Sequence, residues 1–226
     1  KSDFDYSYTA DDVADLQRLE NVLERLSKSV MLSAESDASE IIRRRLFEWD
    51  HSAITADGRV LMPDDAHETC RAYADWVQEN RQYLPALVNP DLAREQFLAA
   101  YPFHPMAISV FERKWQALPR FQRTRGILRL LALWVSHAYS NGYKGAHHDP
   151  LITLGTAPLE DLIFRSAVFE QLGQNLLETA VTTDIAGKKD AHAVRLDTEA
   201  VDAIKKARLH RKVATAIFFE SNGGQA

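Results

Sequence analysis

Residues 123–139 read RTRGILRLLALWVSHAY and carry the strongest helical pattern in the chain. Their apolar side chains recur three and four positions apart, which is the spacing that places residues on one face of an α-helix. The predicted buried face consists of Ile127, Leu128, Leu131, Trp134, Val135 and Ala138. This segment therefore predicts a helix that presents a broad apolar stripe to a core.

Similar patterns extend outward from this helix in both directions. Helical spacing and cap residues predict further helices over residues 10–28, 36–49, 64–83, 91–100, 105–118 and 158–179. In the 36–49 helix, Ile41 belongs to the predicted buried stripe, whereas Arg43 falls off it. Asp197 is the expected N-cap of the last helix, because its carboxylate can accept hydrogen bonds from free amides of the first turn.

Strand signals are short and few. Residues 30–32, the Asp57-Gly58 turn within 54–61, and residues 151–154 are compatible with short strands. Residues 213–219 fit either a helix or a strand, because short β-branched and aromatic runs do not discriminate between them. We therefore predict a mainly α protein with a few short strands.

A turn-rich stretch at 142–150 is the best candidate for a domain boundary. It separates a predicted helical bundle over residues 1–145 from a smaller helical or winged-helix-like region over 146–226, and the two could also pack as one unit. The first and last residues do not resemble natural chain ends, so we expect a fragment of a longer protein.

Composition limits the class of protein. Of the 226 residues, 46% are hydrophobic and 26% are charged, which is typical of a folded domain and not of a disordered chain. The formal charge of −5 argues against a protein that coats nucleic acid indiscriminately. A lone cysteine, Cys70, and the lack of long apolar runs favour a soluble cytoplasmic protein without membrane spans.

Positive charge is concentrated in two segments of this acidic chain. The first segment, 113–129, holds Arg113, Lys114, Arg120, Arg123, Arg125 and Arg129. The second, 205–212, holds Lys205, Lys206, Arg208, Arg211 and Lys212. Such segments suit phosphate backbones, but they are equally typical of solvated faces whose cations pair with acids such as those of residues 1–40.

Motifs for nucleotide or metal binding are largely missing from this sequence. Neither a P-loop pattern nor a strand-borne Gly-x-Gly-x-x-Gly occurs, so the chain has no phosphate cradle of the usual kinds. His67 and Cys70 lie one helical turn apart without a second pair, and His147-His148-Asp149 lies in an expected loop. We expect no metal site and no catalytic residue in this chain alone.

Arg125 and Arg129 are the sharpest candidates for chemistry. Their spacing of four places them on one helix face, which continues through Ala132 and Ser136 and lies opposite much of the apolar stripe. Two guanidinium groups near a helix start, beside free amides and the positive dipole end, suit a phosphate. The alternative is a surface helix whose arginines pair with acids elsewhere.

Several segments together resemble a family of large bacterial ATP-binding proteins. They are residues 40–47, 101–106, 121–132, 149–154 and 212–221, so the resemblance covers most of the chain. The family is described mainly as a domain of unknown function, is associated with anti-phage defence, and is often encoded beside a DNA methyltransferase.

The resemblance implies an AAA+ or related P-loop ATPase in which a helical lid follows the nucleotide-binding domain. The lid motif Gly-x-x-Arg matches Gly126-Ile127-Leu128-Arg129, which implies Arg129 as the nucleotide-sensing arginine and Arg125 as the second choice. The family motif often has a helix-starting residue such as Pro inside it, and the departure here leaves the assignment open by one turn. ATP and Mg²⁺ would be held by an upstream domain, so this chain should not hydrolyse ATP alone.

The sequence thus predicts a lid-like part of a defence-associated ATPase, which couples nucleotide state to motion. Its implied partners are the upstream nucleotide-binding domain, DNA and a DNA methyltransferase system, and an oligomer is compatible with the sequence. One alternative is a helical nucleic-acid-binding module that uses the basic segments 113–129 and 205–212. The other is a structural interaction scaffold.

Overall fold

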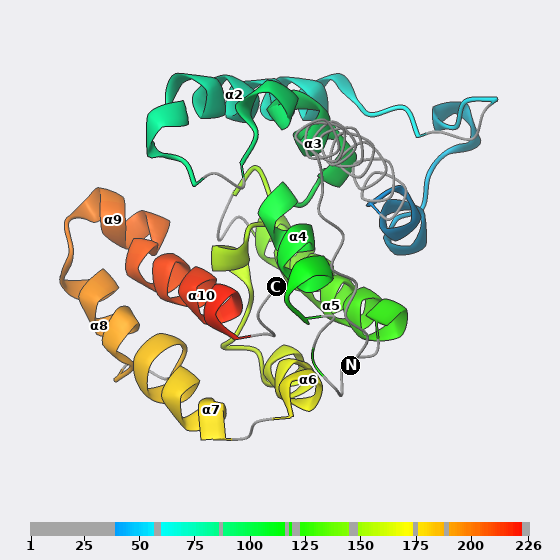
Figure 1. Ribbon diagram of the computed structural model, residues 1–226. Helices are drawn as coiled ribbons and strands as arrows, with labels where there is room; N and C mark the ends of the chain where they lie inside the picture. The colour runs from blue at the N-terminus through cyan, green and yellow to red at the C-terminus, as the bar shows by residue number, and fades with distance from the viewer. Residues whose placement is uncertain are drawn as a thin grey trace, which may run out of the picture.

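The computed structural model describes residues 39–56, 60–85, 88–115, 118, 123–144, 149–173, 176–187 and 190–222. These residues form a mainly α structure, as the sequence predicts (Figure 1). Extended pairing among them is limited to two isolated bridges, Ile54 with Val60 and Phe103 with Ile152. The predicted helix over 10–28, the 30–32 strand, His147, His148 and Arg120 lie outside the described residues.

The first half of the described chain is a series of helices that ends with α5. A short helix over 39–46 precedes α2 (Asp64–Glu79), α3 (Ala93–Ala100), α4 (Pro105–Arg113) and α5 (Arg123–Tyr143). α2 packs against α3 at one end of the molecule (Figure 1). The 3₁₀ turn η3 (Pro90–Leu92) precedes α3, and the Asn89 side chain accepts a hydrogen bond from the Asp91 amide, as expected for a residue before a helix-starting Pro.

The helices described in the second half have at most 13 residues. After the 3₁₀ turn η5 (Leu154–Thr156) come α6 (Leu162–Leu172), α7 (Leu176–Ala180), the short π-helix η6 (Val181–Ile185), α8 (His192–Glu199), α9 (Asp202–Ala207) and α10 (Leu209–Ser221). The single helix predicted over 158–179 is wrong, because Gly173 adopts the left-handed conformation (φ 68°) and ends α6. The open alternative at 213–219 is settled as a helix, α10.

An aromatic cluster joins α4, α5, α6 and α10. Trp134 of α5 stacks on Phe219 of α10 with ring centroids 5.9 Å apart, and meets Phe164 of α6 edge-on at 5.8 Å. Trp115 also stacks on Phe219, with ring centroids 5.4 Å apart. Its Nε1 donates a hydrogen bond to the Phe219 carbonyl oxygen. Residues on both sides of the 142–150 stretch therefore share one hydrophobic core.

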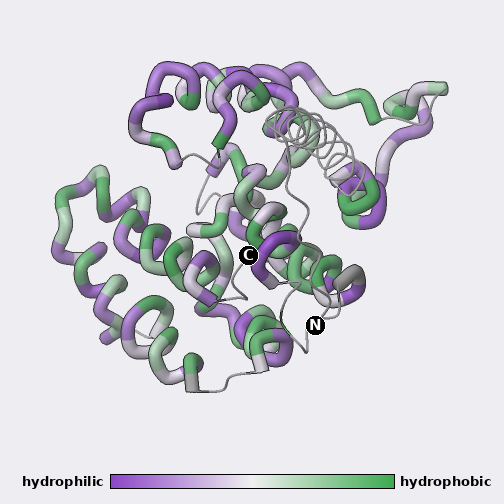
Figure 2. Tube along the Cα trace, in the orientation of Figure 1, coloured by the Kyte–Doolittle hydropathy of each residue, from purple (hydrophilic) through white to green (hydrophobic). Residues whose placement is uncertain are grey.

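A second, smaller core lies between α2 and α3. Cys70, Ala74 and Val77 of α2 pack there with Ala93 and Phe97 of α3. Figure 2 shows that hydrophobic and hydrophilic residues are interspersed along both helices. α2 and α3 are thus amphipathic helices that bury one stripe against each other.

The prediction for the 36–49 helix is wrong about its end, which lies at residue 46, and about part of its buried stripe. The helix described there covers 39–46, and its buried and exposed residues differ from the predicted stripe. Ile41 is 54% exposed, whereas Arg43 is only 6% exposed. Ile42 is buried as predicted. The helix is turned so that an arginine faces the protein, because this side chain finds buried hydrogen-bond acceptors that a hydropathy pattern does not contain.

Asp197 has a different role from the predicted one. It lies inside α8 instead of before a last helix, and it is 2% exposed. Its carboxylate accepts hydrogen bonds from the backbone amides of His210 and Arg211 at the start of α10, and from the Arg211 guanidinium at 2.9 Å. Asp197 therefore does satisfy free amides of a helix start, but of α10 rather than of its own helix.

Candidate functional site

Arg125 and Arg129 lie in the first two turns of α5, as the sequence predicts. Both side chains are exposed, as are Ala132 and Ser136 farther along the helix. Buried residues of the opposite face include Ile127, Leu130, Leu131 and Trp134. The predicted polar face of this helix is therefore confirmed as solvent-accessible, while Gly126 of the Gly-x-x-Arg pattern is buried.

Arg129 forms an ion pair with Glu170 of α6. The distance from Nη1 to Oε2 is 2.8 Å, and the two side chains are 54% and 60% exposed. An ion pair this exposed contributes only about 0–1 kcal/mol, so another anion can replace Glu170 at little cost. Arg125 makes no ion pair with another residue of the described ranges. Both guanidinium groups are accessible to an anionic ligand.

The rest of the first basic segment is divided between different surroundings. Lys114 bonds to the side chain of Glu220 at 2.6 Å and to its carbonyl oxygen, and thereby ties the end of α4 to the end of α10. Arg113 donates from Nε to Ser109 Oγ at 2.6 Å. Arg123 is the first residue of α5. Among the described side chains of this segment, Arg113 and Lys114 thus bond within the chain, apart from the exposed Arg125–Arg129 face.

Most cations of the second basic segment have partners within the chain. Arg208 lies 3.9 Å from Glu160, Arg211 lies 2.9 Å from Asp197, and Lys212 lies 2.5 Å from Asp149. Lys205 donates to the Thr198 carbonyl oxygen at 3.3 Å, and Lys206 is exposed. Acids outside residues 1–40 therefore partner these cations, which reduces the charge available to a nucleic acid.

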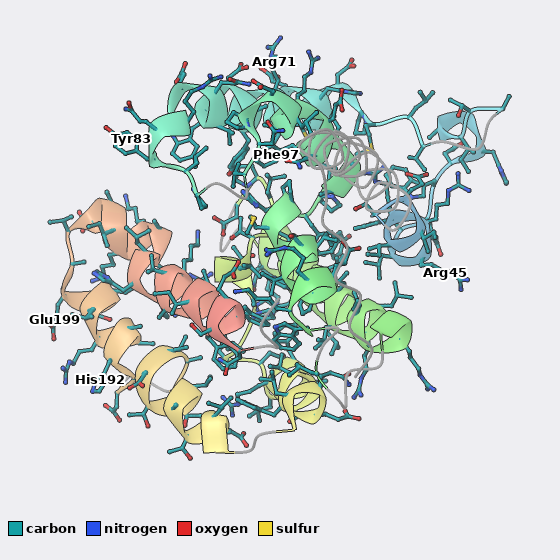
Figure 3. All side chains as sticks on the ribbon, in the orientation of Figure 1. Arg45, Arg71, Tyr83, Phe97, His192 and Glu199 are labelled. Carbon is teal, nitrogen blue, oxygen red and sulfur yellow. The ribbon has the colours of Figure 1, made fainter. Side chains whose placement is uncertain are left out.

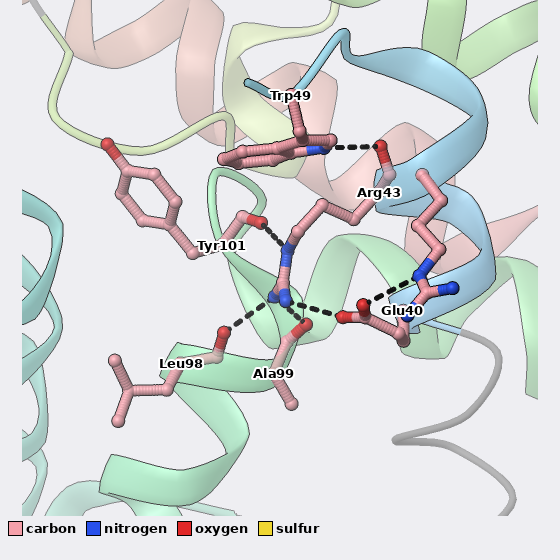
Figure 4. Close-up of polar contacts among 7 residues, drawn as sticks. Glu40, Arg43, Trp49, Leu98, Ala99 and Tyr101 are labelled. Carbon is pink, nitrogen blue, oxygen red and sulfur yellow. Dashed lines mark hydrogen bonds and ion pairs between the residues drawn. The ribbon is translucent and has the colours of Figure 1, made fainter. Parts of the chain in front are cut away.

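Arg43 is a buried, hydrogen-bonded cation that the sequence pattern did not predict (Figure 4). Its guanidinium donates to the carbonyl oxygens of Leu98, Ala99 and Tyr101 at 2.7, 2.5 and 3.2 Å, and pairs with Glu40 at 2.9 Å. Burial lowers the pKa of Arg43, and the Glu40 carboxylate opposes this effect.

The location of the Arg43 contacts explains its role. Leu98 and Ala99 belong to the last turn of α3, where backbone carbonyls have no partner within the helix. A buried cation that satisfies these carbonyls also complements the negative end of the helix dipole. Arg43 therefore fastens helix 39–46 to the end of α3. The Glu40–Arg43 spacing was the one available signal, but it does not distinguish a surface pair from a buried one.

A cavity of about 960 Å³ lies between α2, α3 and α4, and no local motif indicated it. Its walls are mostly apolar and include Tyr73, Trp76, Phe97 and Ile108. In Figure 3, Phe97 lies between the helices, whereas Arg71 of α2 projects away from the molecule. Residues from these three helices and from the segment between α2 and α3 line this volume, so it exists only through their packing.

Within the described ranges, no group of three or more His, Cys, Asp or Glu side chains is placed to hold a metal ion. His67 is exposed on α2, whereas Cys70 is fully buried, and burial raises the pKa of its thiol. No helix of the described part is long and apolar enough to cross a membrane.

No family model matches the chain, and no curated protein and no solved structure shows significant similarity to it.

Proposed function

We propose that this chain is the helical, lid-like part of a defence-associated ATP-binding protein, in which Arg129 contacts the nucleotide phosphates. The observation that carries the proposal is the exposed pair of arginines one turn apart at the start of α5. Together with the Gly126–Arg129 spacing and the family resemblance, this arrangement supports a phosphate-sensing role. Arg125 is the second cation of the same face.

The Arg129–Glu170 pair supplies a mechanism for such a role. Glu170 of α6 pairs with Arg129 at the solvent-exposed surface, with 2.8 Å between Nη1 and Oε2. A γ-phosphate carries more charge and more acceptor oxygens than a carboxylate, so it would compete for the guanidinium. Exchange of Glu170 for phosphate would change the contacts between α5 and α6. ATP and Mg²⁺ would be bound by the upstream domain, whose closure against this helix would then depend on the nucleotide.

The test is steady-state ATP hydrolysis by the full-length protein with Arg129→Met. Loss of a cation that stabilises charge in phosphoryl transfer reduces turnover by roughly a hundredfold or more. Arg195→Met is the matched control, because Arg195 is also an exposed arginine beside a surface carboxylate, Glu199. Hydrolysis that is equal in the two variants would sink the role of Arg129.

A nucleic-acid-binding function receives less support from the same surfaces. The cations at positions 114, 208, 211 and 212 have acidic partners within the chain. DNA binding by basic segments should weaken steeply with salt. Measuring fragment binding to duplex DNA at several salt concentrations separates this alternative from the lid proposal. A purely structural scaffold would leave both hydrolysis and DNA binding unchanged in the arginine variants.

A further inference from the structure

The cavity between α2, α3 and α4 has the size and lining of a small-molecule site. Its volume of about 960 Å³ falls at the upper end of the range typical of ligand pockets. The apolar part of the wall comes from all three helices and from the turn after α2. It includes Tyr73, Trp76, Val77, Leu84, Val88 and Phe97. A ligand that fits this wall must have a substantial apolar body.

The polar part of the wall lies mainly along α4. His104, the N-cap residue, lines the cavity near the start of this helix, and Ser109 and Arg113 line it farther along. His104 and Arg113 are nine residues apart, which is about 13 Å along a helix. The cavity thus has a neutral donor toward one end of α4 and a cation toward the other.

Arg113 has unused hydrogen-bonding capacity. Its Nε donates to Ser109 Oγ at 2.6 Å, whereas its Nη2 is buried and has no hydrogen-bond partner in the structure as described. A buried guanidinium nitrogen without an acceptor is costly and rare. An anionic group bound beside Ser109 would supply that acceptor after a small rotation of the side chain.

The remaining titratable groups restrict the charge of the ligand. The His104 Nδ1 accepts a hydrogen bond from the Met106 amide, which leaves the proton on Nε2. Burial lowers the pKa of His104 to about 4, so it is a neutral donor at pH 7. Glu95 and Glu112 also line the cavity. These two carboxylates repel a second negative charge, so a singly charged head group on the Arg113 guanidinium is favoured over a doubly charged phosphate.

We propose that this cavity binds an amphiphilic monocarboxylate, with its apolar body against α2 and α3 and its carboxylate on the Arg113 guanidinium. The inference does not depend on the proposed phosphate role of Arg129, because the two sites use different residues. Its failure would leave the ATP-hydrolysis test unaffected.

Isothermal titration of the 226-residue chain with dodecanoate tests the proposal. We expect dodecanoate to bind, and dodecyltrimethylammonium, which has the same chain and the opposite charge, to bind at least about tenfold more weakly. Arg113→Met should weaken the binding of dodecanoate about tenfold or more, since a hydrogen bond to a charged group is lost. Arg94→Met is the matched control, because Arg94 is an exposed arginine of α3 outside the cavity lining. It should leave the affinity unchanged.

A second variant locates the ligand independently of Arg113. Ala72 is exposed on α2 and lines the cavity, so Ala72→Trp should fill part of the volume and abolish binding without disturbing a buried residue. Circular dichroism establishes that each variant is folded. If Arg113→Met does not fold, Ala72→Trp and the ammonium comparison decide the question. Absence of dodecanoate binding, equal binding of the two amphiphiles, or binding that survives Ala72→Trp would each overturn the proposal.

Discussion

Arg43 and Arg129 are the same residue type on two helices, with opposite surroundings. The Arg43 side chain is 7% exposed and contacts three backbone carbonyls and one carboxylate (Figure 4). The Arg129 side chain is 54% exposed and meets one carboxylate, Glu170. The Arg43 guanidinium makes these contacts within the protein, whereas the Arg129 guanidinium can exchange its carboxylate partner for another anion.

The difference shows how the neighbouring backbone decides the role of a cation. Arg43 meets the open C-terminal turn of α3, whose carbonyls need donors. Arg129 pairs with the exposed carboxylate of Glu170, which water can solvate when the ion pair is broken. A buried pair of this kind is costly to break because its partners stay behind unsatisfied, whereas an exposed pair is cheap to break.

Removal of the buried cation should have the largest effect. Arg43→Met should lower the free energy of unfolding by about 3–5 kcal/mol, because three buried carbonyls lose their donor and Glu40 keeps only Arg44 as a partner. Urea denaturation measures this loss. Arg45→Met is the control on the same helix, since Arg45 is exposed and should change stability by less than about 0.5 kcal/mol (Figure 3). Equal effects of the two variants would refute the role of Arg43.

Asp197 extends the comparison to a buried anion. Burial favours its neutral form, but hydrogen bonds from Arg211 and His210 outweigh this effect and lower the pKa of the carboxyl. Asp197→Ala should cost about 2–4 kcal/mol, because it removes the helix cap of α10 and leaves Arg211 without its partner. The exposed Asp75→Ala serves as control in the same denaturation experiment. A loss below 1 kcal/mol would contradict the capping role.

His104 adds a pH dependence of known sign. Its pKa is about 4 in the folded protein, against 6.5 for the free side chain, because burial disfavours the charged form. Between these values the unfolded chain binds more protons, so the free energy of unfolding rises with pH. The contribution of at most about 3 kcal/mol is present above pH 6.5 and is lost as the pH falls toward 4. In His104→Asn, which keeps a cap residue, this pH-dependent part of the stability should vanish.

The smallest stability effect is expected for the exposed arginine. Arg129→Met should change the free energy of unfolding by less than about 0.5 kcal/mol, and Glu170→Gln should behave similarly. Thermal denaturation at low and high salt is a sufficient measurement. A loss of 2 kcal/mol or more would place Arg129 with Arg43 as a structural residue and remove the basis for its proposed exchange of partners.

The local sequence predicted helices and their exposed faces correctly where one helix buries one continuous stripe. The mainly α class and the accessible Arg125–Arg129 face of α5 could both be predicted, because each depends on residues within a few positions of one another. The single 158–179 helix failed at Gly173, whose left-handed conformation ends α6 there.

Tertiary packing alone decided the roles of Arg43, Asp197 and the cavity. Arg43 contacts carbonyls 55–58 positions away, and Asp197 caps a helix that begins 12 residues after it. Such partners are chosen by which free backbone groups the packed helices bring together, and hydropathy carries no record of them. The spacing of apolar residues therefore determined which helices form. The need to satisfy buried polar groups determined how they join and which cations remain free for a ligand.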